Sequence, residues 1–147
     1  MLVCLSCWEV FEKDIMNPTY AGQMWCPKKS CGGVVVVDID ECLIPVIKLL
    51  NQKGYFTEYC CSGHFWDSNP ESGFYGGAYI SFDECVQLED IINLPAGFTA
   101  EVIESKKVVV IRKKYEPADL ADLHIAILKA AIDLTAWAEG LAERSED

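Results

Sequence analysis

The chain has 147 residues, of which 51% are hydrophobic and 24% are charged, a composition typical of a globular protein with one core domain. Its net charge of -11 argues against sequence-independent attraction to phosphate. No apolar run approaches the roughly 20 residues that cross a bilayer, and residues 1–4 lack the charged region of a secretory signal. These observations predict a cytoplasmic protein with no membrane partner.

Two pairs of cysteines near the start carry the clearest chemical signal. Cys4 and Cys7 form the first pair, and Cys26 and Cys31 form the second. Each short spacing lets two sulfurs face inward from one tight bend, and four thiolates placed in this way close a tetrahedral zinc site. We therefore predict a zinc ribbon over residues 1–37, with zinc as its cofactor. The eight cysteines could instead form disulfides in a secreted protein, but the missing signal and the paired spacing favour metal and free thiols.

A run of four valines at residues 34–37 marks the transition from the ribbon to the rest of the chain. Its β-branched residues predict a strand. Asp38 or Asp40 then caps a predicted helix, whose apolar residues recur at helical spacing and which ends before Gly54. We place the domain boundary at the end of the valine strand, with an α+β core domain over residues 38–147.

The core domain is expected to contain four strands and two further helices. Strand patterns lie at residues 55–60, 79–82, 99–104 and 108–113. Helical patterns predict a short helix at residues 83–93 and a long one after residues 115–117, running to about residue 144. The buried stripe of the long helix is expected to include Leu120, Leu123, Ile127, Leu128, Ala131, Leu134 and Ala138. This order predicts an α+β fold, in which a zinc ribbon precedes a largely antiparallel sheet covered by helices.

The segment from Cys60 to His64 brings thiols, a hydroxyl, a flexible glycine and one of the two histidines to the exit of a predicted strand. Strand alternation sends Cys60 and the next cysteine to opposite faces. The amides of residues 62–64 could receive an oxyanion or carboxylate, and nearby aromatic rings could stack on a base. We predict a ligand-binding site that consists of Cys61, Ser62, Gly63, His64, Trp66 and Tyr75.

Two other chemistries of this segment stay open. Cys61 could act as a nucleophile if His64 activates its thiol, although the sequence assigns no third group that would orient the histidine. Alternatively, Cys60 or Cys61 could join His64 in a second metal site, with Cys42 or Cys85 as a further ligand.

Basic residues gather in one region of this acidic chain: Lys106, Lys107, Arg112, Lys113 and Lys114. They form a local basic stripe on a predicted hairpin. Such charges discourage strand addition at the edge of a sheet, and they could also contact an anionic ligand or RNA.

Residues 39–64 carry a family resemblance. They combine a predicted helix that ends in Leu-Asn, the sequence Gly-Tyr-Phe-Thr at residues 54–57 and Cys-Ser-Gly at residues 61–63. This pattern resembles the helix, strand and Cys-Ser-Gly-Arg signature of the wybutosine-synthesis methyltransferase family, which acts on tRNA. The resemblance implies a functional role for residues 61–63 and S-adenosylmethionine as a cofactor. His64 replaces the arginine of that family, which removes a permanent cation from the turn.

The whole pattern, with cysteine pairs followed by a Cys-Cys-Ser-Gly-His turn, also resembles uncharacterised zinc-ribbon proteins of bacteria and phages. Three functions are then in view. We favour a zinc-binding protein that binds a small nucleotide-like molecule or RNA at the Cys-Ser-Gly-His turn. The alternatives are an RNA methyltransferase that uses S-adenosylmethionine, and an adaptor whose ribbon and long helix bind a protein partner while zinc contributes folding energy only.

Overall fold

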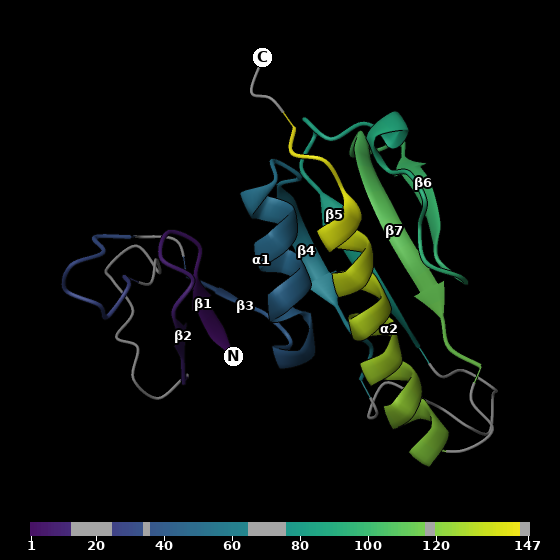
Figure 1. Cartoon of the computed structure of the whole chain (residues 1–147), viewed down its shortest axis with the longest axis horizontal. Helices are drawn as coiled ribbons and strands as arrows, with labels where there is room; N and C mark the ends of the chain where they lie inside the picture. Colours follow the sequence, from purple (N-terminus) through teal and green to yellow (C-terminus); the bar gives the residue numbers. More distant parts are fainter. Residues whose placement is uncertain (13–24, 34–35, 65–75, 117–119, 145–147) are drawn as a thin grey trace.

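The computed structural model describes residues 1–12, 25–33, 36–64, 76–116 and 120–144 (Figure 1). Its strands form a three-stranded and a four-stranded sheet, and every pairing is antiparallel. Two α-helices accompany the larger sheet. The predicted α+β class is therefore confirmed, together with an N-terminal cysteine cluster.

The small sheet has the order β2-β1-β3 and consists of β1 (Leu2–Cys4), β2 (Val10–Phe11) and β3 (Val36–Asp38). All three residues of β1 are buried. The strand predicted at the valine run is thus present from residue 36, and residues 34–35 lie outside the described residues. Val3 and Ile39 belong to the same apolar cluster as the main core. The division of the chain at residue 37 stays a prediction.

The first helix is confirmed, but its predicted cap is not. A 3-10 turn, η2 (Glu41–Leu43), leads into α1 (Ile44–Gln52), and Gly54 follows with φ 83°. Asp40 precedes η2 without a side-chain capping bond. Its carboxylate instead accepts hydrogen bonds from Ser62, more than twenty positions further along the chain. Tertiary partners thus displace the local cap expected from the sequence.

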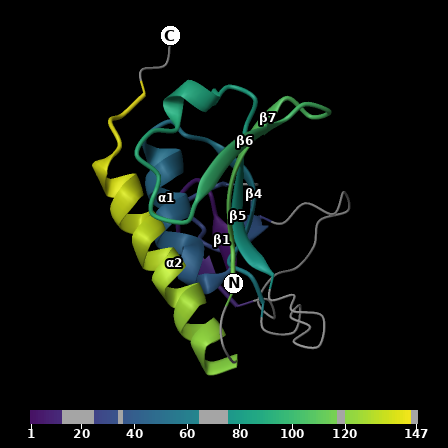
Figure 2. The same cartoon turned by 90° about the vertical axis from the view of Figure 1, so that its right-hand side faces the viewer.

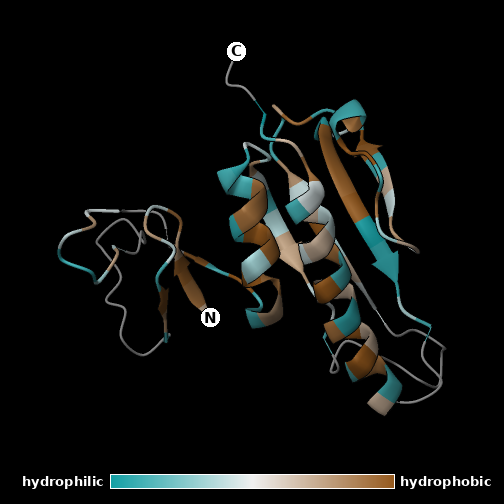
Figure 3. Cartoon of the chain, viewed as in Figure 1, coloured by the Kyte–Doolittle hydropathy of each residue, from teal (hydrophilic) through white to brown (hydrophobic). Residues whose placement is uncertain are grey.

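The main sheet has the order β4-β5-β7-β6. It consists of β4 (Thr57–Cys61), β5 (Gly77–Phe82), β6 (Thr99–Ile103) and β7 (Val108–Lys114), which confirms the four predicted strands with small shifts of their ends. Alternation along β5 buries Ala78, Ile80 and Phe82 on one face. Figure 3 shows that β7 is hydrophobic along most of its length and hydrophilic at its end, where the basic residues lie.

The prediction of a helix at residues 83–93 is wrong. The segment forms turns and one short 3-10 helix, η5 (Leu88–Asp90). Asp83 Oδ1 accepts a bond from the Cys85 amide at 3.0 Å, and the Gln87 amide donates to Asp90 Oδ2 at 2.9 Å. These bonds from side chains to nearby backbone compete with helical hydrogen bonds, so the apolar pattern alone was misleading here.

The long helix is present as α2 (Leu120–Gly140), and it ends before the predicted residue 144. Of the predicted stripe, four residues are buried and Ile127 is half-buried, whereas Leu128 is 45% exposed and that prediction is wrong; the side chain of Leu120 lies outside the described residues. Ala130 and Trp137 are buried instead. None of the helices in the described ranges combines the length and the apolar character that crossing a membrane requires.

Both α-helices pack side by side on the same face of the main sheet (Figure 2). The core lies between this layer and the inward side chains of the strands. No described helix covers the opposite face, which we call the open face. Strand register assigns to the open face Tyr59, Cys61, Gly77, Tyr79, Ser81, Val110, Arg112 and Lys114.

Candidate metal centre and neighbouring sites

The four predicted zinc ligands come together at one end of the small sheet. Their sulfur atoms all lie within 4.8 Å of one another. Cys4 Sγ lies 3.7 Å from Cys31 Sγ, and Cys7 Sγ lies 3.7 Å from Cys26 Sγ. Tetrahedral zinc with bonds of about 2.3 Å separates its sulfurs by about 3.8 Å, whereas a disulfide brings two sulfurs to about 2 Å. The cluster has the dimensions of a metal site, and none of the eight cysteines, all of which the structure describes, forms a disulfide.

The two cysteine turns share a left-handed backbone conformation at one position. The residue after the second cysteine of each pair has a positive φ, 59° at Trp8 and 65° at Gly32. In the first turn the Trp8 amide donates to Cys4 O at 2.8 Å. In both turns the left-handed residue reverses the chain directly after the second sulfur, so the cysteines of each pair can face the same point.

Gly33 allows the second turn to close against the first. A Cβ atom at this position would lie 2.8 Å from Ser6 Oγ, 3.0 Å from Cys4 Sγ and 3.1 Å from Cys31 Sγ. Only a residue without a side chain fits beside the sulfurs. An ion pair also joins the turns, since Lys28 Nζ lies 2.7 Å from Glu9 Oε1.

The surroundings of the sulfurs affect their protonation in opposite directions. Burial raises the pKa of Cys4, but hydrogen bonds from the amides of Cys7 and Ser6 outweigh it and lower the pKa to about 7. Burial is the main cause that raises the pKa of Cys26 to about 12. Because metals bind thiolates, metal binding at this cluster must release protons.

The Cys-Ser-Gly-His turn follows β4 and is fastened to Asp40. The Ser62 amide donates to Asp40 Oδ2 at 2.7 Å, and Ser62 Oγ donates to the same oxygen at 2.9 Å. His64 Nε2 lies 3.0 Å from Asp40 Oδ1. Burial raises the pKa of Asp40, but these hydrogen bonds outweigh it and hold the pKa below its usual value. The Ser62 amide, which was expected to receive an oxyanion, thus donates to a carboxylate of the chain itself.

Cys61 completes a group of three side chains, which we call the thiol centre: Asp40, Cys61 and His64. One potential ligand or hydrogen-bonding atom from each lies within 4.8 Å of the others. Cys61 Sγ lies 3.8 Å from His64 Nδ1 and accepts a bond from the Gly63 amide at 3.3 Å. Asp40 is the partner of His64 that sequence reasoning missed, since its position before a helix suggested only a cap.

The other cysteines considered for a second metal site, all of them described in the structure, do not belong to the thiol centre. Neither Cys42, Cys60 nor Cys85 belongs to it. Cys60 packs against the core on the opposite face of β4, as strand alternation predicts, and burial raises its pKa to about 12. Cys85 is exposed.

A buried tyrosine binds the Cys-Ser-Gly-His turn from the core side. Tyr115 is 2% exposed, and its hydroxyl donates to Ser62 O at 2.7 Å. Gly63 has φ 82°, and a Cβ atom there would lie 2.8 Å from the Tyr115 ring and 3.1 Å from Gly77 O. The glycine of the turn is therefore required by packing within the protein. Trp66 and Tyr75, the remaining predicted ligand residues, lie outside the described residues and stay predictions.

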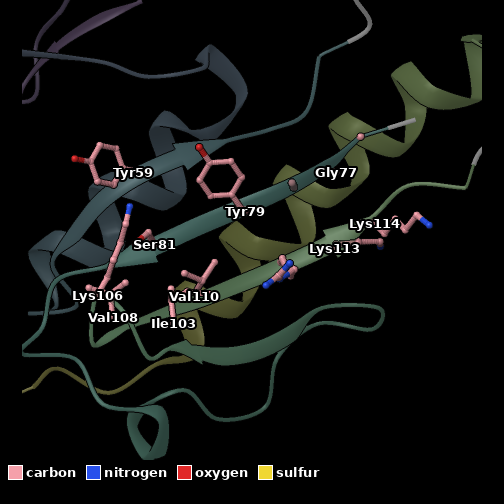
Figure 4. Close-up of a pocket in the computed structure, with 13 residues that line it drawn as sticks. Tyr59, Gly77, Tyr79, Ser81, Ile103, Lys106, Val108, Val110, Lys113 and Lys114 are labelled. Carbon is pink, nitrogen blue, oxygen red and sulfur yellow. The ribbon is translucent and has the colours of Figure 1, made fainter. Parts of the chain in front are cut away.

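Next to the thiol centre, the open face carries a hollow of about 690 Å³ (Figure 4). Tyr59 is 62% exposed and Tyr79 is 39% exposed, and both line it. The basic stripe contributes Lys106, Arg112, Lys113 and Lys114 to its lining. Lys106 Nζ lies 5.9 Å from the centre of the Tyr59 ring, and Arg112 forms an ion pair with Glu101. Cys61 pairs with Tyr79 in the sheet, and Tyr79 pairs with Arg112, so one row crosses the face.

Comparisons of the chain with protein-family models, with curated proteins and with solved structures found no match. The features of the chain that point to a function are the cysteine cluster, the thiol centre and the open face.

Proposed function

We propose that the protein is a zinc-binding protein that binds nucleotides, either as a small molecule or as single-stranded RNA, on the open face beside the Cys-Ser-Gly-His turn. One observation carries this proposal: two exposed tyrosines and a group of cations line the same hollow. A base offers an apolar face and its phosphate offers negative charge, and the hollow presents a partner for each.

The tyrosines are placed for stacking. Tyr59 pairs with Ser81, and Tyr79 pairs with Cys61, so the two rings lie diagonally on neighbouring strands (Figure 4). Stacking of a base on an aromatic side chain contributes about 1–3 kcal/mol and tolerates any base. A pair of rings on one face therefore favours a ligand with a base, or with successive bases, over an aliphatic anion.

The cations of the basic stripe lie along the hollow. Residues 105–115 contain five basic residues and no acidic one, in a chain whose net charge is -11. Lys106 lies at one end of the hollow and Lys114 at the other. This local field attracts an anion that reaches the hollow, while the acidic remainder of the chain opposes diffuse binding to nucleic acid.

Zinc is the metal that four thiolates at these distances favour. Native mass spectrometry of protein purified without chelator should show one zinc ion per chain. Cys26→Ser should lose that ion, since it removes one of the four sulfurs. Cys85→Ser, which alters an exposed cysteine outside the cluster, should retain it. Disulfide-bonded sulfurs, or equal zinc content in both variants, would contradict the assignment.

Nucleotide binding is tested by fluorescence anisotropy with a labelled RNA of about ten nucleotides, and by competition with mononucleotides. Tyr79→Ala should weaken RNA binding by about 5- to 100-fold, whereas Tyr79→Phe retains the ring and should stay within about twofold. Lys114→Ala should weaken binding and reduce the salt dependence by about 0.7 in the slope of log K against log salt. The charge-matched control is Lys129→Ala, because Lys129 lies on α2, which covers the face of the sheet opposite the hollow.

The outcomes of this assay separate the candidate ligands. Tight binding of RNA with weak competition by mononucleotides identifies RNA as the ligand, and the reverse identifies a small molecule. Unchanged affinity in both Tyr79→Ala and Lys114→Ala would show that the open face is not the site. Adding S-adenosylmethionine with a labelled methyl group to the same mixture tests the methyltransferase alternative implied by the wybutosine resemblance.

A further inference from the structure

We propose that the thiol centre is nucleophilic: His64, oriented by Asp40, takes the proton of Cys61, whose sulfur then adds to an electrophilic sp² carbon of a bound ligand. The activation of the thiol stands on the geometry of the free protein. The identity of the ligand that supplies the carbon rests on the proposed function.

The histidine is held in the tautomer that this chemistry requires. A carboxylate only accepts hydrogen bonds, so the 3.0 Å contact with Asp40 Oδ1 assigns the proton to His64 Nε2. In the neutral ring Nδ1 then carries the lone pair, and it is the ring atom that faces Cys61 Sγ at 3.8 Å. A nucleophile, a base within reach and a third group that orients the base are the recurring parts of thiol catalysis.

The parts of this centre are themselves fixed. Ser62 donates twice to Asp40 Oδ2, and Tyr115 holds Ser62 from the core. The carboxylate therefore cannot rotate without breaking bonds to a buried residue. The Gly63 amide donates to Cys61 Sγ at 3.3 Å, a bond that is stronger to a thiolate than to a thiol.

A metal explains this group less well. The two oxygens of Asp40 already accept three hydrogen bonds, from the amide and the hydroxyl of Ser62 and from His64. An ion at this place would compete with these bonds for Asp40, and the described residues otherwise offer it Cys61 and His64. Protein zinc sites use three or four such ligands.

The reaction balances without an oxidant or a reductant. The thiol proton passes to His64 Nδ1, and a bond forms between Cys61 Sγ and the carbon. The π bond of that carbon breaks, and its electrons move to the attached oxygen or nitrogen, which takes the proton from His64. Cys61 is paired with Tyr79, whose ring lines the hollow, so the thiol belongs to a residue directly across the strand pair from the proposed ligand site.

The test uses iodoacetamide on the zinc-loaded full chain at neutral pH, with the rate at each cysteine resolved by peptide mass spectrometry. The probe forms a bond from sulfur to carbon and releases iodide. Cys61 should react at least about tenfold faster than N-acetylcysteine, and faster than Cys60 and Cys85 in the same molecules. This comparison needs no variant.

Two variants then test the roles of the other residues. His64→Gln should slow alkylation of Cys61 at least about tenfold and leave the rate at Cys85 unchanged, and His64→Asn serves if the first variant does not fold. Asp40→Asn should slow alkylation several-fold. Because Asp40 is a positioning residue that acts through His64, its effect should disappear in the background of His64→Gln, whereas a purely structural effect would persist.

Three outcomes would overturn the inference. The first is a rate at Cys61 no faster than that of N-acetylcysteine. The second is a fast rate that His64→Gln leaves unchanged. The third is a second equivalent of zinc that His64→Gln removes, which would make the group a metal site. The probe requires no nucleotide, so failure of RNA binding and failure of thiol activation are separate results.

Discussion

Asp40 Oδ1 and His64 Nε2 lie 3.0 Å apart, although 24 positions separate the two residues in the chain. The contact joins the segment that follows β3 to the turn that follows β4. It thereby connects the strand that leaves the cysteine cluster with the edge of the main sheet. The turn after β4 is therefore held by a residue that lies next to the small sheet.

Asp40 should make the free energy of unfolding depend on pH at acidic pH. Its pKa is lowered in the folded protein, so its contribution to stability is fully present above the unfolded value of about 4 and is lost as the pH falls through the lower folded value. The difference in free energy of unfolding between the wild type and Asp40→Asn should therefore shrink below about pH 4. Urea titrations between pH 3 and 7 measure it. Asp133→Asn, which breaks only an exposed pair with Lys129, should show a small difference throughout.

Tyr115→Phe should destabilise the fold by about 1–3 kcal/mol, because it leaves the carbonyl of the buried Ser62 without its donor. The ring and its packing against Gly63 remain in this variant. Tyr79→Phe removes a hydroxyl from an exposed tyrosine and should cost much less. Chemical denaturation of both variants checks the expectation, which equal losses in the two would contradict.

Gly33→Ala should weaken zinc binding more than Gly32→Ala does. The methyl group at position 33 would meet Cys4 Sγ at 3.0 Å and Cys31 Sγ at 3.1 Å, whereas at position 32 nothing lies within 4 Å. Gly32→Ala carries only the free-energy cost of placing a side chain on a residue with φ 65°, in the left-handed region, about 1–2 kcal/mol. Competition with a chromophoric chelator measures both affinities. A loss at position 32 as large as that at position 33 would mean that crowding of the sulfurs is unimportant.

Lys53→Met should destabilise the C-terminal end of α2. Lys53 Nζ donates to Glu139 O at 2.7 Å and to Leu141 O at 2.5 Å, so it binds carbonyls at the end of this helix. Methionine keeps the apolar stem but loses both bonds, and we expect a cost of about 1–3 kcal/mol. Amide exchange at residues 136–144 should accelerate. Lys48→Met, at an exposed position of α1, is the matched control and should leave that exchange unchanged.

The parts of the fold with local signals were predictable. The cysteine spacings place four ligands on two tight turns, and each turn needs only its own few residues to form. The strands of the main sheet were found because β-branched and aromatic residues between turn signals mark them, and in β5 the burial of Ile80 and Phe82 agrees with the predicted strand at residues 79–82. The antiparallel order followed from short connections, such as the turn between β6 and β7.

The parts that depend on distant partners were not predictable. Asp40 has the sequence context of a helix cap, and only its contact with the Cys-Ser-Gly-His turn shows its other role. At residues 83–93, side chains such as Asp83 and Asp90 bind nearby amides in place of a helical pattern. Leu128 fits the apolar spacing of α2 but lies to one side of the face that packs on the sheet.

The pairing of β3 would let an ion in the cysteine cluster influence residues other than its own ligands. Cys4 ends β1 and pairs with Val36, and Leu2 pairs with Asp38, two residues before Asp40. Loss of an ion from the cysteine cluster would loosen β1, and with it β3, the strand that leads to this carboxylate. Chelation should then slow the alkylation of Cys61, so that metal at one end of the chain would tune the reactivity of a thiol in the main sheet.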